Sequence, residues 1–135
     1  MQPDPAHVRS WLKKADHDIR IAEAALALEQ PVTDAAGFHC QQAVEKLLKA
    51  YLVSRGRTFE KIHDLEVLTD LCAECDDAFR SLVDQVEPLT SFAVQFRYPG
   101  PDDPLVDEVS EALMIVRRVW DFVLSRLPTD ARWPP

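Results

Sequence analysis

Glycine is scarce in this sequence, with three residues in 135, and nine of the ten prolines lie near the ends or in expected connections. Only Pro88 interrupts a segment that is otherwise periodic. Because glycine and proline mark turns, and because proline breaks helices, their absence elsewhere leaves long uninterrupted runs. These runs favour long helices over a turn-rich β fold.

Cysteine is also sparse, and the three residues are Cys40, Cys72 and Cys75. An odd number without a secretory signal favours a reduced protein, which we expect in the cytoplasm. Cys72 and Cys75 have the C-x-x-C spacing of metal and redox sites, but zinc takes four ligands and no second cysteine or histidine pair follows. The same spacing fits one helix face, so we predict core or boundary cysteines, no metal site and no cofactor.

Long hydrophobic runs are missing from the chain. None approaches the about 20 residues that a membrane-spanning helix requires, so no membrane partner is expected. Hydrophobic residues still make up 47% of the chain, which argues against disorder. A chain of this length can form a single core, so we place one helical domain at residues 1–128 and expect a disordered tail at residues 129–135.

Positive charge is in deficit, and the formal net charge is −8. This excess of acid argues against indiscriminate binding to nucleic acid. Residues 45–63 hold five basic and two acidic residues, whereas residues 64–113 hold thirteen acidic residues against Arg80 and Arg97. These regions are either two solvated faces of opposite sign, or a local anion site and an acidic surface for a basic partner.

Apolar residues recur at spacings of three and four along most of the chain, which is typical of helices with one buried face. Three helices are expected in the first half, and each begins at a residue suited to capping. They run from Asp4 to Leu26, from Thr33 or Asp34 to about Arg55, and from Asp64 to about Cys75.

Two further helical segments are expected in the second half. The first restarts at Asp76 or Asp77, is kinked by Pro88 and ends at Arg97. The last opens with Asp103 and Pro104 and continues to about Leu127. The whole pattern predicts an all-α protein, an antiparallel up-down four-helix bundle with an additional short helix.

The last helix carries apolar residues on two faces. One face keeps a 3-4 repeat and is expected in the core: Val106, Val109, Leu113, Val116, Trp120, Val123 and Leu127. The flanking face adds Leu105, Ala112, Ile115, Val119 and Phe122. Because a bundle helix that is apolar so far round often serves a second interface, we predict a homodimer.

A polar stripe runs along the second helix. Its members follow one another at intervals of three, four and three residues, and are His39, Gln42, Lys46 and Lys49. Such a stripe is suited to binding an anion such as phosphate. The alternative is internal pairing, in which His39 bonds to Asp18 and Glu45 pairs with Lys49.

Several motifs occur along the chain in a definite order. Residues 38–52 read Phe-His-Cys-Gln-Gln-Ala-Val-Glu-Lys-Leu-Leu-Lys-Ala-Tyr-Leu, and the later motifs are Gly56, Lys61-x-His63-Asp64-Leu65 and Arg97-Tyr98-Pro99. The opening helix carries Trp11-Leu12-x-x-Ala15-x-x-Asp18. Over roughly residues 8–125, this set resembles the prokaryotic HEPN domains.

The resemblance implies an up-down helical bundle that commonly dimerises. Members of this family often accompany a small nucleotidyltransferase encoded beside them, and many such pairs behave as toxin and antitoxin. Several branches are metal-independent endoribonucleases that use an arginine and a histidine four to six residues later. The resemblance therefore implies a nucleotide- or RNA-associated module with a separate nucleotidyltransferase as its partner.

The sequence departs from the nuclease pattern at its late end. Arg97 stands where the family's arginine is expected, but no histidine follows His63. RNA cleavage without a metal needs a group that handles the 2′-hydroxyl proton, and Arg97 supplies only a cation for the phosphate. We therefore lean against an enzyme. The alternatives are an endoribonuclease that uses Arg97 with His63, and a purely structural dimeric adaptor.

The predicted binding site draws on several segments. The residues expected to bind a nucleotide or its phosphate are His39, Gln42, Lys46, Lys49, Lys61 and Tyr98, with Arg97 and His63 beside them. Lysine and arginine bind phosphate, and an aromatic ring such as Tyr98 or Phe59 stacks on a base. The residue before a proline is pushed out of helical geometry, so Arg97 and Tyr98 lie at a forced helix exit. That position suits a site, and equally suits a cap by Arg97 on its own helix.

Overall fold

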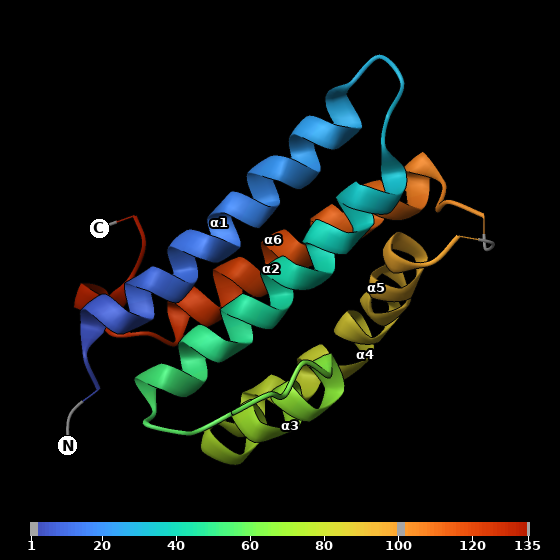
Figure 1. Ribbon diagram of the computed structural model, residues 1–135. Coiled ribbons are helices and arrows are strands. Elements are labelled where there is room, and N and C mark those ends of the chain that lie inside the picture. Colours follow the sequence, from blue (N-terminus) through green and yellow to red (C-terminus); the bar gives the residue numbers. More distant parts are fainter. Residues whose placement is uncertain (1–2, 100–101, 135) are drawn as a thin grey trace.

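The computed structural model describes residues 3–99 and 102–134, and these form helices and connections without a β-strand (Figure 1). The elements are α1 (Pro5–Ala27), α2 (Thr33–Ser54), α3 (Leu65–Cys75), η1 (Asp77–Leu82), α4 (Val83–Val86), η2 (Glu87–Leu89), α5 (Thr90–Arg97), α6 (Val106–Ser125) and η3 (Thr129–Ala131), where η denotes a 3₁₀ helix. The last residue of the predicted tail, Pro135, lies outside the described residues.

Four helical stretches make the bundle. α1 and the stretch from η1 to α5 run in one direction, whereas α2 and α6 run in the opposite direction (Figure 1). α3 is the additional short helix, and a connection that passes back along the bundle joins it to α2 (Figure 1). α2 is central, because it packs against α1, α3, α5 and α6. The predicted helical bundle is confirmed.

The core lies around one face of α2. Five side chains that the sequence assigns to this face are buried, namely Cys40, Val44, Leu47, Leu48 and Tyr51. Gly37, on the same helix, lies under α5, and a Cβ at this position would come within 2.8 Å of Cδ1 of Phe92. The glycine therefore lets α5 approach α2 closely.

Three of the predicted helix starts are confirmed. Asp4 caps α1. Pro5 follows at the first helical position, where a backbone N–H would have no acceptor within the helix and its absence in proline costs nothing. Asp64 caps α3 by accepting two backbone N–H groups, and Asp76 caps η1 by accepting one. Pro88 lies in η2, between α4 and α5, so the predicted break in this segment is also confirmed.

The predicted caps of α2 and α6 are wrong. α2 begins at Thr33, its capping position is Val32, and no side chain bonds there. α6 begins at Val106, three residues after Asp103. Its start is held by Glu108, whose carboxylate accepts the backbone N–H of Leu105 at 3.0 Å.

The flanking face of α6 is largely internal. Ala112 and Val119 are buried, and Ile115 and Phe122 are half-buried against the core. Val106, which the repeat assigns to the core, is 45% exposed instead. Val109, Leu113, Val116, Val123 and Leu127 are buried as predicted, so the buried arc includes the predicted core face and extends into the flanking face, of which Leu105 is 67% exposed. The prediction of a homodimer stays a prediction.

The segment after Pro128 differs from the expected disordered tail. Thr129–Ala131 form η3, which packs on α1, and Ala131 is buried. The side chain of Arg9 donates a hydrogen bond to the carbonyl of Asp130. Hydrogen bonds to backbone carbonyls and the apolar contacts of Ala131 and Trp133 thus fix a segment whose composition alone predicts fraying. No helix in the described residues is long and apolar enough to cross a membrane.

Candidate functional site

A buried carboxylate links the first two helices. Asp18 on α1 has a side chain that is only 8% exposed. One of its oxygens lies 2.7 Å from Nδ1 of His39, and the other lies 2.5 Å from Nζ of Lys46. Both partners belong to the polar stripe of α2. The pairing of His39 with Asp18, one of the two readings of the stripe, is therefore present.

This pairing sets the hydrogen-bonding state of His39. An ionised carboxylate only accepts hydrogen bonds, so Nδ1 of His39 carries the proton that faces Asp18. In the neutral imidazole, Nε2 is then an acceptor. The side chains of His39 and Lys46 are 27% and 24% exposed. Both residues support the fold, and both still reach the surface.

A second buried ion pair lies farther along α2. Glu45 and Lys49 are each 6% exposed and lie 3.1 Å apart. The ammonium of Lys49 also lies 5.6 Å from the ring centre of Trp11 and 5.4 Å from that of Phe59. A charge enclosed in this way needs its partner, because an unpaired buried charge is strongly unfavourable. Lys49 is therefore committed to Glu45 and to the two rings.

The polar stripe is thus divided between two internal pairs. Gln42 donates to the side-chain oxygen of Gln41 at 2.7 Å, and Gln41 lies 3.4 Å from Glu45. Each lysine of the stripe has its own carboxylate, Asp18 for Lys46 and Glu45 for Lys49. The stripe alone carries no surplus of positive charge.

The connection between α2 and α3 holds two more of the predicted residues. His63 is 71% exposed, and its Nδ1 lies 3.2 Å from the carboxylate of Glu45. Lys61 is exposed, and its φ of 58° places it in the left-handed region. His63 therefore belongs to the Glu45 pair, near the middle of α2.

Arg97, the last residue of α5, lies beside a different part of α2. Its guanidinium carbon is 5.9 Å from the ring centre of Phe38. Phe38 and Glu45 are seven residues apart on α2, which is about 10 Å along the helix axis. The structure therefore places Arg97 and His63 beside different turns of α2, and does not bring them together as a catalytic pair.

An aromatic pair lies beneath Arg97. Phe38 of α2 and Phe96 of α5 stack with ring centres 4.5 Å apart and planes inclined by 21°. We call this pair the Phe38–Phe96 platform. The ring of His39 meets Phe38 edge-on at 5.4 Å, and Tyr98, immediately after α5, is 63% exposed. The platform thus adjoins a cation and an imidazole, and an exposed phenol follows Phe96 by two residues.

Sequence reasoning did not assign the two phenylalanines to the site. Each directly precedes a predicted site residue, Phe38 before His39 and Phe96 before Arg97. That adjacency was the available signal. It did not indicate a binding role, because an aromatic residue at helical spacing is more often part of the core.

The thiols are poorly suited to chemistry. Burial raises the pKa of the Cys40 thiol to about 12, and burial likewise raises the pKa of Cys72. Cys75 is half-buried, and its sulfur lies 3.5 Å from Nη1 of Arg57. Within residues 3–99 and 102–134, no group of three or more histidine, cysteine, aspartate or glutamate side chains is arranged to hold a metal ion.

Comparison with known proteins identifies the family. The HEPN domain model matches residues 8–127 of the chain. This chain belongs to the HEPN family. HEPN domains are nucleotide- and RNA-related modules. The family match agrees with the resemblance seen over residues 8–125.

A solved structure supports the same assignment. The HEPN chain is similar to TT1696 from Thermus thermophilus, a crystal structure, with 30% sequence identity and a TM-score of 0.78. The similarity covers 89% of this chain and 98% of TT1696. None of the curated proteins compared with the chain matches it.

Proposed function

We propose that this HEPN domain binds a nucleotide or single-stranded RNA and acts with a separate small nucleotidyltransferase, the two forming a toxin–antitoxin pair. The observation that carries the binding proposal is the Phe38–Phe96 platform with the guanidinium of Arg97 over it. Aromatic faces stack on bases, and guanidinium groups pair with phosphates. The platform supplies both groups at one place.

The geometry ranks the predicted binding residues. Arg97 and Tyr98 adjoin the platform by sequence and are exposed, and His39 contacts Phe38. Lys46 shares the carboxylate of Asp18 with His39, and Gln42 lies one turn before Lys46. We infer that these five residues line the site. Lys49 is enclosed, and Lys61 lies in the connection with His63. We therefore place both lysines at the edge of the nucleotide site and not among the residues that line it.

Binding is tested with fluorescent single-stranded oligoadenylate RNA and with ATP as probes. Wild-type protein should bind the RNA saturably, and Arg97→Ala and Phe96→Ala should each weaken binding about tenfold, which corresponds to about 1.4 kcal/mol. Arg80→Ala is the matched control, because it removes the same charge at an exposed position on η1. Binding that is absent, or unchanged in Arg97→Ala, contradicts the proposal.

The partnership with a nucleotidyltransferase has a covalent consequence. Tyr98 presents a phenol, 63% exposed, to which the partner could transfer a nucleotidyl group from a nucleoside triphosphate with release of pyrophosphate. Coexpression with a small nucleotidyltransferase encoded beside the gene, followed by pull-down and intact-mass measurement, tests this. A complex and a mass increase that Tyr98→Phe abolishes are expected. An unaccompanied protein of unchanged mass counts against the partnership.

We also infer that the protein forms a homodimer, because HEPN domains often function as dimers. Sedimentation velocity over a range of concentrations should show a dimer, and a monomer at all concentrations would contradict this. The nuclease alternative is not proposed, since Arg97 and His63 lie at different turns of α2.

A further inference from the structure

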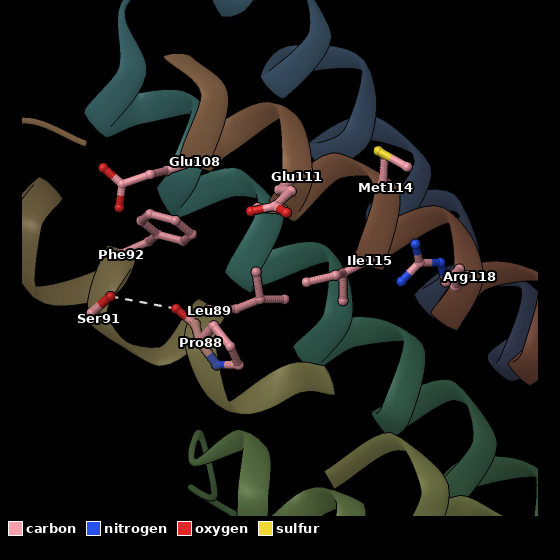
Figure 2. Close-up of a pocket in the computed structure, with 10 residues that line it drawn as sticks. Pro88, Leu89, Ser91, Phe92, Glu108, Glu111, Met114, Ile115 and Arg118 are labelled. Atoms are coloured by element: carbon pink, nitrogen blue, oxygen red, sulfur yellow. Dashed lines mark hydrogen bonds between the residues drawn. The ribbon is translucent and has the colours of Figure 1, made fainter. Parts of the chain in front are cut away.

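A groove lies between α5 and α6, away from the polar stripe. Its volume is about 350 Å³, and its floor is formed by Leu89, Phe92 and Ile115 (Figure 2). Figure 2 shows these side chains converging from the two sides, with the carboxylates of Glu108 and Glu111 at the edge. The volume is at the small end of pockets that hold ligands, which span about 300–1,000 Å³.

Exposed apolar side chains surround this part of the chain. Ten large apolar side chains are exposed in the described residues, and six of them lie between residues 94 and 114: Val94, Phe96, Tyr98, Leu105, Val106 and Met114. Met114, at 55% exposed, lines the groove itself. Together with the apolar floor of Leu89, Phe92 and Ile115, Met114 gives the groove a surface of the kind that marks interaction sites.

The charge around the groove favours a basic polypeptide as its partner. Glu108 and Glu111 are exposed on the groove, and Arg118 is the basic side chain among its lining residues. One carboxylate oxygen of Glu108 already accepts the N–H of Leu105, which leaves the other oxygen for a partner. Residues 64–113 hold thirteen acidic and two basic residues. A basic partner is therefore favoured both locally and at long range.

We propose that this groove docks a basic amphipathic segment of another protein, a helix that presents apolar side chains on one face and lysine or arginine beside them. An apolar side chain would enter between Phe92 and Ile115, and flanking cations would pair with Glu108 and Glu111. This is the mode by which an amphipathic helix lies in an apolar groove. A second copy of the chain fits less well, because each copy carries a net charge of −8 and two groove carboxylates against one arginine.

The proposal is independent of the nucleotide site and is tested on the full chain with a labelled peptide. The probe is a helical leucine–lysine peptide about four turns long, with leucine on one face. A peptide of equal charge with serine in place of leucine is the control. The first should bind at least about tenfold more tightly than the second, because only the first fills the groove. Equal affinity for the two peptides overturns the proposal.

Two variants locate the binding. Glu111→Lys and Met114→Ser should each weaken binding of the leucine–lysine peptide by about tenfold or more. Glu29→Lys and Ile21→Ser are matched controls, since Glu29 is exposed and Ile21 is 50% exposed on α1, and both should bind like wild type. Equal loss in the controls overturns the proposal. The proposal is also overturned if the protein forms a dimer that the peptide does not disrupt and that Met114→Ser dissociates, because a second copy of the chain then occupies the groove.

Discussion

Asp18 both joins two helices and positions two residues of the candidate site. It comes from α1, and both of its partners, His39 and Lys46, come from α2. The same carboxylate therefore ties the helices and sets the imidazole of His39 with Nε2 as an acceptor in its neutral form. Loss of Asp18 would leave the ammonium of Lys46 without its counter-ion in a largely enclosed position.

Asp18→Ala should lower the free energy of unfolding by about 2–4 kcal/mol, because it removes one partner of a buried pair and leaves the other unpaired. Urea denaturation followed by circular dichroism measures the change. Asp70→Ala, at an exposed position on α3, is the control and should change stability by less than about 0.5 kcal/mol. Similar losses in the two variants would refute the assigned role of Asp18.

The thiols give a second prediction at this scale. The pKa of Cys40 is raised to about 12 by burial, so at pH 8 its thiolate fraction is roughly one in ten thousand. The pKa of Cys72 is raised in the same direction. At pH 8, Ellman's reagent should modify Cys75 in the native protein, and the other two thiols only after unfolding in urea. Fast reaction of all three native thiols would show that the core is open.

Individual helices were predictable where a local signal agreed with the tertiary structure. Asp4 and Asp64 cap their helices, and Pro88 breaks the segment in which it stands. The starts of α2 and α6 did not follow the predicted cap residues, because no side chain bonds at the capping position of α2 and Glu108 rather than Asp103 holds the start of α6. On α6 most of the predicted core face is buried, but the sequence missed that Ala112 and Val119 are buried too, since a helix that is apolar on two faces does not reveal how much of it its neighbours cover.

Val119 discriminates between the two faces of α6. The structure buries it completely, whereas the sequence pattern placed it on an outward interface. Val119→Asp should therefore destabilise the monomer by at least about 3 kcal/mol, because it buries a carboxylate without a partner. Met114→Asp, at a position 55% exposed on the same helix, should leave the thermal unfolding midpoint nearly unchanged. A folded Val119→Asp protein that only loses self-association would restore the outward interface.

At the scale of the whole molecule, the sequence predicted the bundle but only part of the site. Helical spacing alone placed the polar stripe on one side of α2. Which carboxylates meet that stripe depends on how α1 packs and on which turns face it, so the pairing of Asp18 remained one of two open readings. The separation of Arg97 from His63 depends on where α5 and the connection after α2 pass over α2, which no local motif specifies.

The net charge of −8 limits how strongly the whole molecule can bind an anion. The internal pairs neutralise the lysines of the stripe, so the cation available to a phosphate at the platform is Arg97, with His39 and Lys46 at the edge. Binding should accordingly be modest and should weaken as salt rises.

The central claim, that a nucleotide or RNA binds at the Phe38–Phe96 platform, is tested most directly by NMR. Uniformly ¹⁵N-labelled protein would be titrated with AMP and with short single-stranded RNA, and the amide shifts followed. Saturable shifts are predicted at Phe38, His39, Lys46 and residues 96–98. The absence of saturable shifts, or shifts confined to Lys61 and His63 in the connection before α3, would contradict the account.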